Sequence, residues 1–140
     1  PDVEYAPSGC YEGMPAETAV VVVGEQPYAE FKGDTNDLFL TDAHKKLVRH
    51  CKDLGKKVVV VLISGRVLAI APELELSDAF IAAWLPGSEG TGVADFLFGA
   101  DGFKPTGKSP YAWPRKVEDL PLTKYDDRAL FPFGYGLQEY

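Results

Sequence analysis

Three short apolar runs, separated by stretches with helical character, constrain the fold of this chain more than any other feature. They cover residues 19–23, 58–63 and 79–85, and the first two consist largely of valine. Each run is followed within two residues by glycine, which favours a turn. The first two runs, which are rich in β-branched residues, predict strands that are buried on both faces, as in a parallel sheet, and the third run predicts a further strand.

The stretch between the first two runs predicts a helix over residues 42–54. Leu47 and Cys51 lie on one face of this helix, which makes that face apolar. Thr41 is available as an N-cap, and Gly55 is suited to the left-handed conformation that often ends a helix. A brief helix or turn is expected near residue 72, and a further helix over residues 88–98.

Strands and helices in short alternation predict an α/β fold. We expect a mostly parallel sheet with helices on both faces, the α/β sandwich arrangement of flavodoxin-like domains. The 140 residues are the ordinary size of a single domain. Its expected parts are a leading segment (1–18, with a possible edge strand at 3–5), an α/β core (19–98), and an aromatic, proline-rich C-terminal segment (99–140, with a late strand at 111–113).

Composition limits the partners of the chain. It has 14 basic and 21 acidic residues, a net charge of −7, which disfavours nucleic acid and anionic membranes. No apolar run approaches the roughly 20 residues that span a bilayer, so we expect no membrane segment. No metal site or cofactor is predicted, because zinc-like ligand spacing is missing. Cys10 and Cys51 could pair in an oxidising environment, but the helical position of Cys51 favours a buried free thiol.

Candidate functional residues follow the predicted strands. In open parallel sheets, ligands bind beyond the carboxyl ends of the strands, which here lead into residues 24–37, 64–66 and 86–92. A carboxylate near an aromatic ring or another acid can have a raised pKa, as a general acid requires. From composition alone, an ordinary solvated acidic loop remains the alternative. The candidates in the first two loops are Glu25, Tyr28, Glu30, Phe31, Lys32, Asp34 and Arg66.

Five motifs in order give the chain a family resemblance. They are VVGEQPYAEFKGD (22–34), VLISGR (61–66), AAWLPGSEG (82–90), ADFLFG (94–99) and FGYGL (133–137). Together they resemble the C-terminal α/β-sandwich domain of glycoside hydrolase family 3, which contains β-glucosidases and exo-acting glucanases. Each motif alone is modest, but five in the family's order span most of the chain.

The resemblance implies a retaining glycosidase with two domains. A preceding barrel domain would supply the aspartate nucleophile, and this domain would supply the general acid/base. By the loop match that residue is Glu30, with Glu25 as the alternative. Glu25, Tyr28, Phe31, Lys32, Asp34 and Arg66 are then expected to bind substrate or support the loop. Lys32 would lower the pKa of Glu30 and Asp34 would raise it, and the sequence leaves open which of them is close.

The resemblance also implies that the family domain is incomplete here. The barrel and an early strand–helix stretch of the family are missing, and Val67 replaces the family's proline after Gly65-Arg66. We therefore expect an inactive isolated chain that partners with a barrel domain or companion fragment and acts on a β-glucoside or β-glucan oligosaccharide. The alternative is a non-catalytic carbohydrate-binding or interaction module. Family resemblance favours a periplasmic or extracellular location.

Overall fold

The computed structural model describes residues 2–102 and 106–136. In this part of the chain, one sheet holds three parallel strands in the order β1 (Thr18–Gly24), β2 (Lys57–Ile63), β3 (Ala79–Trp84). The helices are α1 (Asp42–Asp53), α2 (Ala71–Leu76) and α3 (Gly90–Phe98), with 3₁₀ turns η1 (Glu30–Gly33), η2 (Ala100–Gly102) and η3 (Val117–Asp119). The predicted parallel α/β fold is confirmed, with element ends moved by one or two residues.

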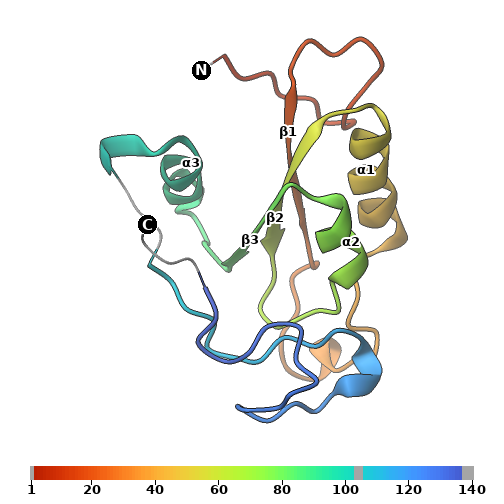
Figure 1. The fold of residues 1–140 in the computed structure, drawn as a ribbon, viewed down its shortest axis with the longest axis vertical. Coiled ribbons are helices and arrows are strands. Elements are labelled where there is room, and N and C mark those ends of the chain that lie inside the picture. The colour runs from red at the N-terminus through yellow and green to blue at the C-terminus, as the bar shows by residue number, and fades with distance from the viewer. Residues whose placement is uncertain (1, 103–105, 137–140) are drawn as a thin grey trace.

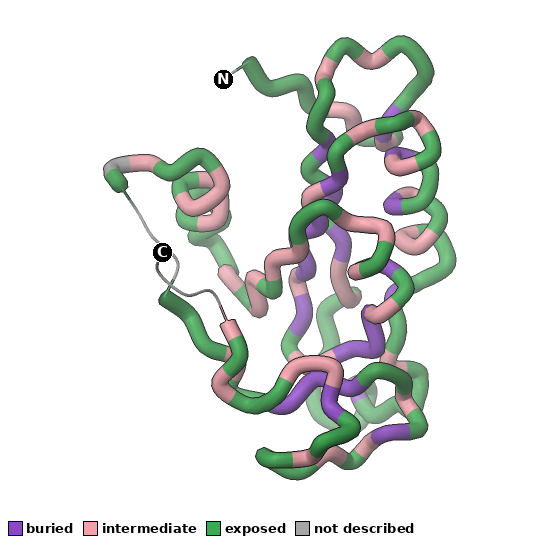
Figure 2. The backbone as a smooth tube through the Cα atoms, viewed as in Figure 1, coloured by how far each residue is buried: buried purple, intermediate pink, exposed green. Residues whose placement is uncertain are grey.

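Helix α1 covers one face of the sheet together with α2 (Figure 1). The helix begins where predicted, because the Thr41 hydroxyl accepts a hydrogen bond from the His44 backbone N–H at 3.3 Å. It ends at the left-handed Gly55, whose φ is +74°. Val48 and Cys51 of α1 are fully buried, and Figure 2 shows buried residues along the sheet and on the inner side of this helix.

The opposite face of the sheet is unevenly covered. Figure 1 shows α3 on the side opposite α1 and α2, but no residue of α3 is buried. Along β1, alternate residues are exposed, including Val20 (45%) and Val22 (60%). The prediction that this strand is buried on both faces was therefore wrong. Only the central strand β2 approaches that state, since its consecutive residues 60–62, whose side chains alternate between the two faces, are all buried.

The part of the C-terminal segment described from residue 106 to 136 crosses the end of the molecule at which the three strands finish (Figure 1). Trp113 is buried there and forms an isolated antiparallel bridge with Phe131. The predicted strand at 111–113 was wrong, because a single bridge replaces a ladder. The Trp84 ring at the end of β3 lies 6.1 Å from the Tyr111 ring and 6.0 Å from the Trp113 ring, so aromatic packing attaches this segment to the sheet.

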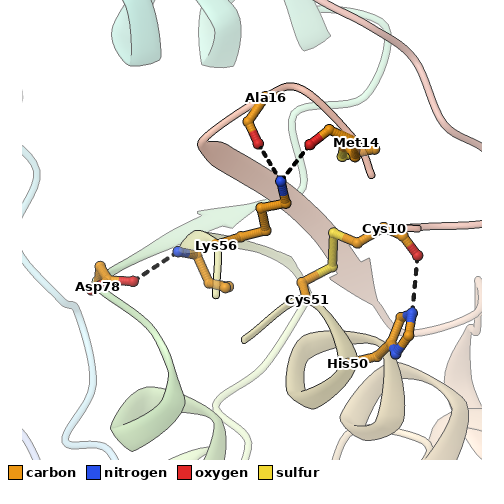
Figure 3. Close-up of a disulfide and its surroundings, with 8 residues drawn as sticks. Cys10, Met14, Ala16, His50, Cys51, Lys56 and Asp78 are labelled. Carbon is orange, nitrogen blue, oxygen red and sulfur yellow. Dashed lines mark hydrogen bonds between the residues drawn. A yellow bond between two sulfur atoms is a disulfide. The ribbon is translucent and has the colours of Figure 1, made fainter. Parts of the chain in front are cut away.

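The leading segment is attached to α1 by a disulfide between Cys10 and Cys51 (Figure 3). The prediction of a free thiol at Cys51 was wrong. The apolar position on the helix was identified correctly, but the sequence held no information on the distance to Cys10. The proposed edge strand at residues 3–5 is also absent, because these residues are exposed and unpaired in the sheet.

Polar contacts hold the same segment on either side of the disulfide. The Lys56 ammonium donates to the carbonyls of Met14 at 2.6 Å and Ala16 at 2.7 Å (Figure 3). The His50 Nε2 lies 3.0 Å from the Cys10 carbonyl oxygen.

Within the described ranges, no helix combines the length and the apolar character needed to cross a bilayer.

Candidate active-site loop at the carboxyl end of the sheet

The candidate residues gather where β1 and β2 end. Glu25 follows β1 directly, and Ser64, Gly65 and Arg66 follow β2. The Glu25 backbone N–H donates to the Ile63 carbonyl at 3.1 Å, which keeps the two chain exits side by side. A Cβ atom at position 24 would clash with the same carbonyl oxygen, so glycine is required for this close approach.

The Glu25 carboxylate is the acceptor for three side-chain donors. Ser64 Oγ donates to its Oε2 at 2.7 Å, and the Tyr28 hydroxyl donates to the same oxygen at 3.3 Å. Arg66 Nε donates to Oε1 at 2.8 Å in an ion pair. The Glu25 side chain is only 16% exposed, so both of its oxygens are committed to partners inside the protein.

Tyr28 fills the space between the loop and the end of β2. The Arg66 guanidinium lies 4.1 Å from the centre of its ring, a cation–π contact. Burial raises the pKa of the Tyr28 hydroxyl, and the Glu25 carboxylate adds to this increase while Arg66 opposes it. The ring also packs against two glycines, because a Cβ atom at Gly33 would clash with it and one at Gly65 would lie 2.9 Å from its hydroxyl.

Glu30 stands apart from this network. It begins the turn η1 with φ at +46°, a left-handed conformation that is uncommon for glutamate. Its side chain is exposed. Among the described residues it forms no ion pair with Lys32, so the direct contact between these two groups that the sequence left open is not made.

The structure thus divides the predicted site residues into two groups. Glu25, Tyr28 and Arg66 lie together in the network, whereas Glu30 and its neighbours Phe31, Lys32 and Asp34 are exposed. Phe31 is 86% exposed, which is unusual for a large apolar side chain. Sequence reasoning missed the role of Ser64, whose single hydroxyl proton lies within hydrogen-bond distance of two acceptors, Glu25 Oε2 and the Arg66 carbonyl oxygen. The only available signal was its position at a strand end.

Replacing Gly33 by Ala is expected to lower the free energy of unfolding by about 1–3 kcal/mol, because the new methyl group overpacks against the Tyr28 ring. Urea unfolding measures this change. Gly92→Ala is the matched control: it lies inside α3 with no atom within 4 Å of the added Cβ, so it should be neutral or slightly stabilising. Equal stability of Gly33→Ala and the unmodified chain would contradict the packing of Tyr28 described above.

The chain is an α/β domain whose acidic loop lies at the carboxyl end of a parallel sheet, where such domains bind ligands. Comparison with known proteins identifies the family to which this domain belongs. The glycosyl hydrolase family 3 C-terminal domain matches residues 13–139. The chain belongs to this family, which confirms the resemblance seen in the sequence motifs. Leu137, the last residue of the closing motif, lies outside the described residues.

The relatives are glycoside hydrolases that are much longer than this chain. A xylan 1,4-β-xylosidase of Xylanibacter ruminicola is 39% identical over 75% of the chain and 13% of its own length. A periplasmic β-glucosidase of Salmonella typhimurium is 33% identical over 87% of the chain and 19% of its own length. The chain therefore spans about a fifth or less of these relatives.

Solved structures agree with the fold. The exo-1,3/1,4-β-glucanase of a Pseudoalteromonas species superposes with a TM-score of 0.76 at 42% identity, covering 94% of this chain and 18% of that one. The β-glucosidase of Listeria innocua gives a TM-score of 0.81 at 27% identity, covering 89% of this chain and 21% of that one.

Proposed function

We propose that this chain is the part of a retaining β-glycoside hydrolase that supplies the general acid/base, Glu30, to a site completed by a barrel domain. One observation carries the proposal: Glu30 is an exposed carboxylate on a loop that is anchored at the carboxyl end of a parallel sheet. Ligands of open parallel sheets bind at this end. Membership of a family of glycoside hydrolases supports the same interpretation.

The choice of Glu30 over Glu25 rests on hydrogen bonding. A general acid must carry a proton that it can deliver to the leaving-group oxygen. Both oxygens of Glu25 already accept hydrogen bonds from Arg66, Ser64 and Tyr28. Neither oxygen is therefore free to deliver a proton. Glu30 has an exposed carboxylate that a second domain could approach.

Retaining hydrolysis needs two carboxyl groups about 5–5.5 Å apart, one acting as nucleophile and one as acid and then base. In the proposed enzyme, Glu30 protonates the leaving-group oxygen while the nucleophile of the barrel attacks the anomeric carbon. After the leaving group departs, the Glu30 carboxylate takes a proton from the water that releases the sugar. Because the nucleophile belongs to the barrel, the isolated chain is expected to be inactive.

The proposed substrates are β-glucosides or β-glucan oligosaccharides, because the related enzymes include β-glucosidases and an exo-1,3/1,4-β-glucanase. The proposed location is periplasmic or extracellular. The Cys10–Cys51 disulfide supports it, since disulfides form and persist in oxidising compartments, and one relative is a periplasmic enzyme.

The test is a graft of residues 1–140 into the Pseudoalteromonas exo-glucanase in place of its matched segment. We expect the graft to hydrolyse aryl β-glucosides and laminari-oligosaccharides, and the isolated chain to hydrolyse neither. A graft that unfolds cooperatively but lacks activity would contradict the proposal. Saturable binding of glucan oligosaccharides by the isolated chain, in calorimetry, would then favour the non-catalytic carbohydrate-binding alternative.

A further inference from the structure

We propose that Arg66 is the positioning residue for Glu30, holding the loop that carries this carboxylate in one arrangement. The inference rests on the proposed function for its catalytic consequence, but the contacts that carry it belong to this chain alone. Arg66 comes from the end of β2, a different element from the loop it would hold.

The side chain of Arg66 contacts the loop at three points. Its Nε donates to Glu25 Oε1 at 2.8 Å, and its Nη1 donates to the Gly33 carbonyl at 2.6 Å. Its guanidinium lies against Tyr28, 4.1 Å from the ring centre. These contacts bracket Glu30 in the sequence, with Glu25 and Tyr28 before it and Gly33 after it. The segment that presents Glu30 is thus fixed on both sides by one side chain.

The backbone at Glu30 makes such support necessary. A non-glycine residue at a φ of +46° is in a conformation that free chains rarely adopt. It persists only where surrounding contacts determine it, and Glu30 has an exposed side chain that supplies no such contact. Beyond the turn's own hydrogen bonds, the contacts able to do so are those of Tyr28 against Gly33 and of Arg66 with the Gly33 carbonyl.

The geometry requires arginine at this position. A planar guanidinium can donate in two directions while its face stacks on an aromatic ring, whereas a lysine ammonium acts as a compact point charge. Arg66→Lys should therefore keep the ion pair with Glu25 and lose either the Gly33 bond or the Tyr28 stacking. Arg66→Gln should lose all three contacts.

Hydrogen exchange measured on the isolated chain tests the positioning role without an activity assay. The Asp34 N–H, which donates to the Phe31 carbonyl at 3.2 Å, reports on the turn η1. In Arg66→Gln we expect exchange of the amides of residues 30–34 to accelerate by roughly 10- to 100-fold, since hydrogen bonds to a charged group are lost. Amides of β2 and α1 should be unchanged. Arg66→Lys should give an intermediate acceleration.

Arg128→Gln is the matched control, because Arg128 also pairs with a carboxylate, Asp126, at 2.7 Å, in the C-terminal segment. It should leave the exchange of residues 30–34 unchanged. Equal acceleration in the two variants, or none in Arg66→Gln, would overturn the proposal. If Arg66→Gln unfolds, Arg66→Lys and Tyr28→Leu provide the same comparison with smaller disturbance.

Activity of the graft described above separates positioning from direct sugar contact. A displaced acid penalises poor leaving groups, so Arg66→Gln should lower kcat/KM for a methyl β-glucoside by roughly 10-fold or more and for a 2,4-dinitrophenyl β-glucoside by less than about 3-fold. In a Glu30→Gln background the Arg66 change should cost little more, because both act through one group. Equal losses with both substrates would assign Arg66 to sugar binding and overturn the proposal.

The two hypotheses can fail independently. If Glu30→Gln does not alter turnover, the proposed function is wrong, but the exchange data still decide whether Arg66 holds the loop. If Glu30→Gln is severe and the exchange of residues 30–34 does not depend on Arg66, the function stands and the positioning role is wrong.

Discussion

Replacing Glu30 by Gln in the grafted enzyme is expected to lower kcat/KM for a poor-leaving-group glucoside by about 100- to 10,000-fold, the usual contribution of a general acid. An amide of the same size preserves the exposed loop and removes only the transferable proton. For a 2,4-dinitrophenyl glucoside the departing group needs no proton, so its release should remain fast and hydrolysis of the glycosyl-enzyme should become limiting.

Steady-state kinetics with a series of aryl glucosides measures this effect. The alkaline limb of the pH profile, which reports the essential acid, should disappear in the variant. Azide needs no general base to attack, so it should restore turnover of the activated substrate. Glu75→Gln, an exposed carboxylate on α2, is the control and should behave like the unmodified graft. Unchanged turnover of the poor substrate in Glu30→Gln would reject the assignment.

Removing the disulfide should have the largest effect on stability. The bond joins Cys10 and Cys51 over a sequence separation of 41 residues. Restriction of the unfolded chain over a loop of that length predicts that the Cys10→Ala/Cys51→Ala variant loses about 4 kcal/mol of unfolding free energy. This is a large share of the stability of a domain of ordinary size.

Urea unfolding with and without a thiol reductant measures that loss. Reductant should lower the urea midpoint of the unmodified chain and leave the midpoint of the double alanine variant unchanged. The variant, which has no disulfide, is therefore the control for other effects of the reductant. Because the bond encloses β1 and the loop that carries Glu30, folding of that loop should depend on it more than folding of α3 does. A reduced chain as stable as the oxidised one would contradict the prediction.

Much of the core was predictable because its signals are local. The short apolar runs indicated all three strands, and the Thr41 and Gly55 caps indicated the ends of α1. The candidate loop was also predictable, since parallel strands must end at one edge of a sheet. The prediction that β1 is buried on both faces failed, because a continuous valine run carries no information on which face of the sheet a helix will cover. Helix α3 leaves Val20 and Val22 exposed.

Local sequence was enough to specify the alternation of elements, the family and the loop on which the carboxylates lie. These follow from propensity, periodicity and motif order, which are properties of neighbouring residues. The three-dimensional arrangement was needed to show that Cys10 meets Cys51, that Glu25 is enclosed by Ser64, Tyr28 and Arg66, and that Glu30 stands free with a left-handed backbone. The first two depend on distances between residues far apart in the chain, which no local pattern encodes. The conformation of Glu30 depends on contacts that its loop makes with the end of β2, which form only in the folded sheet.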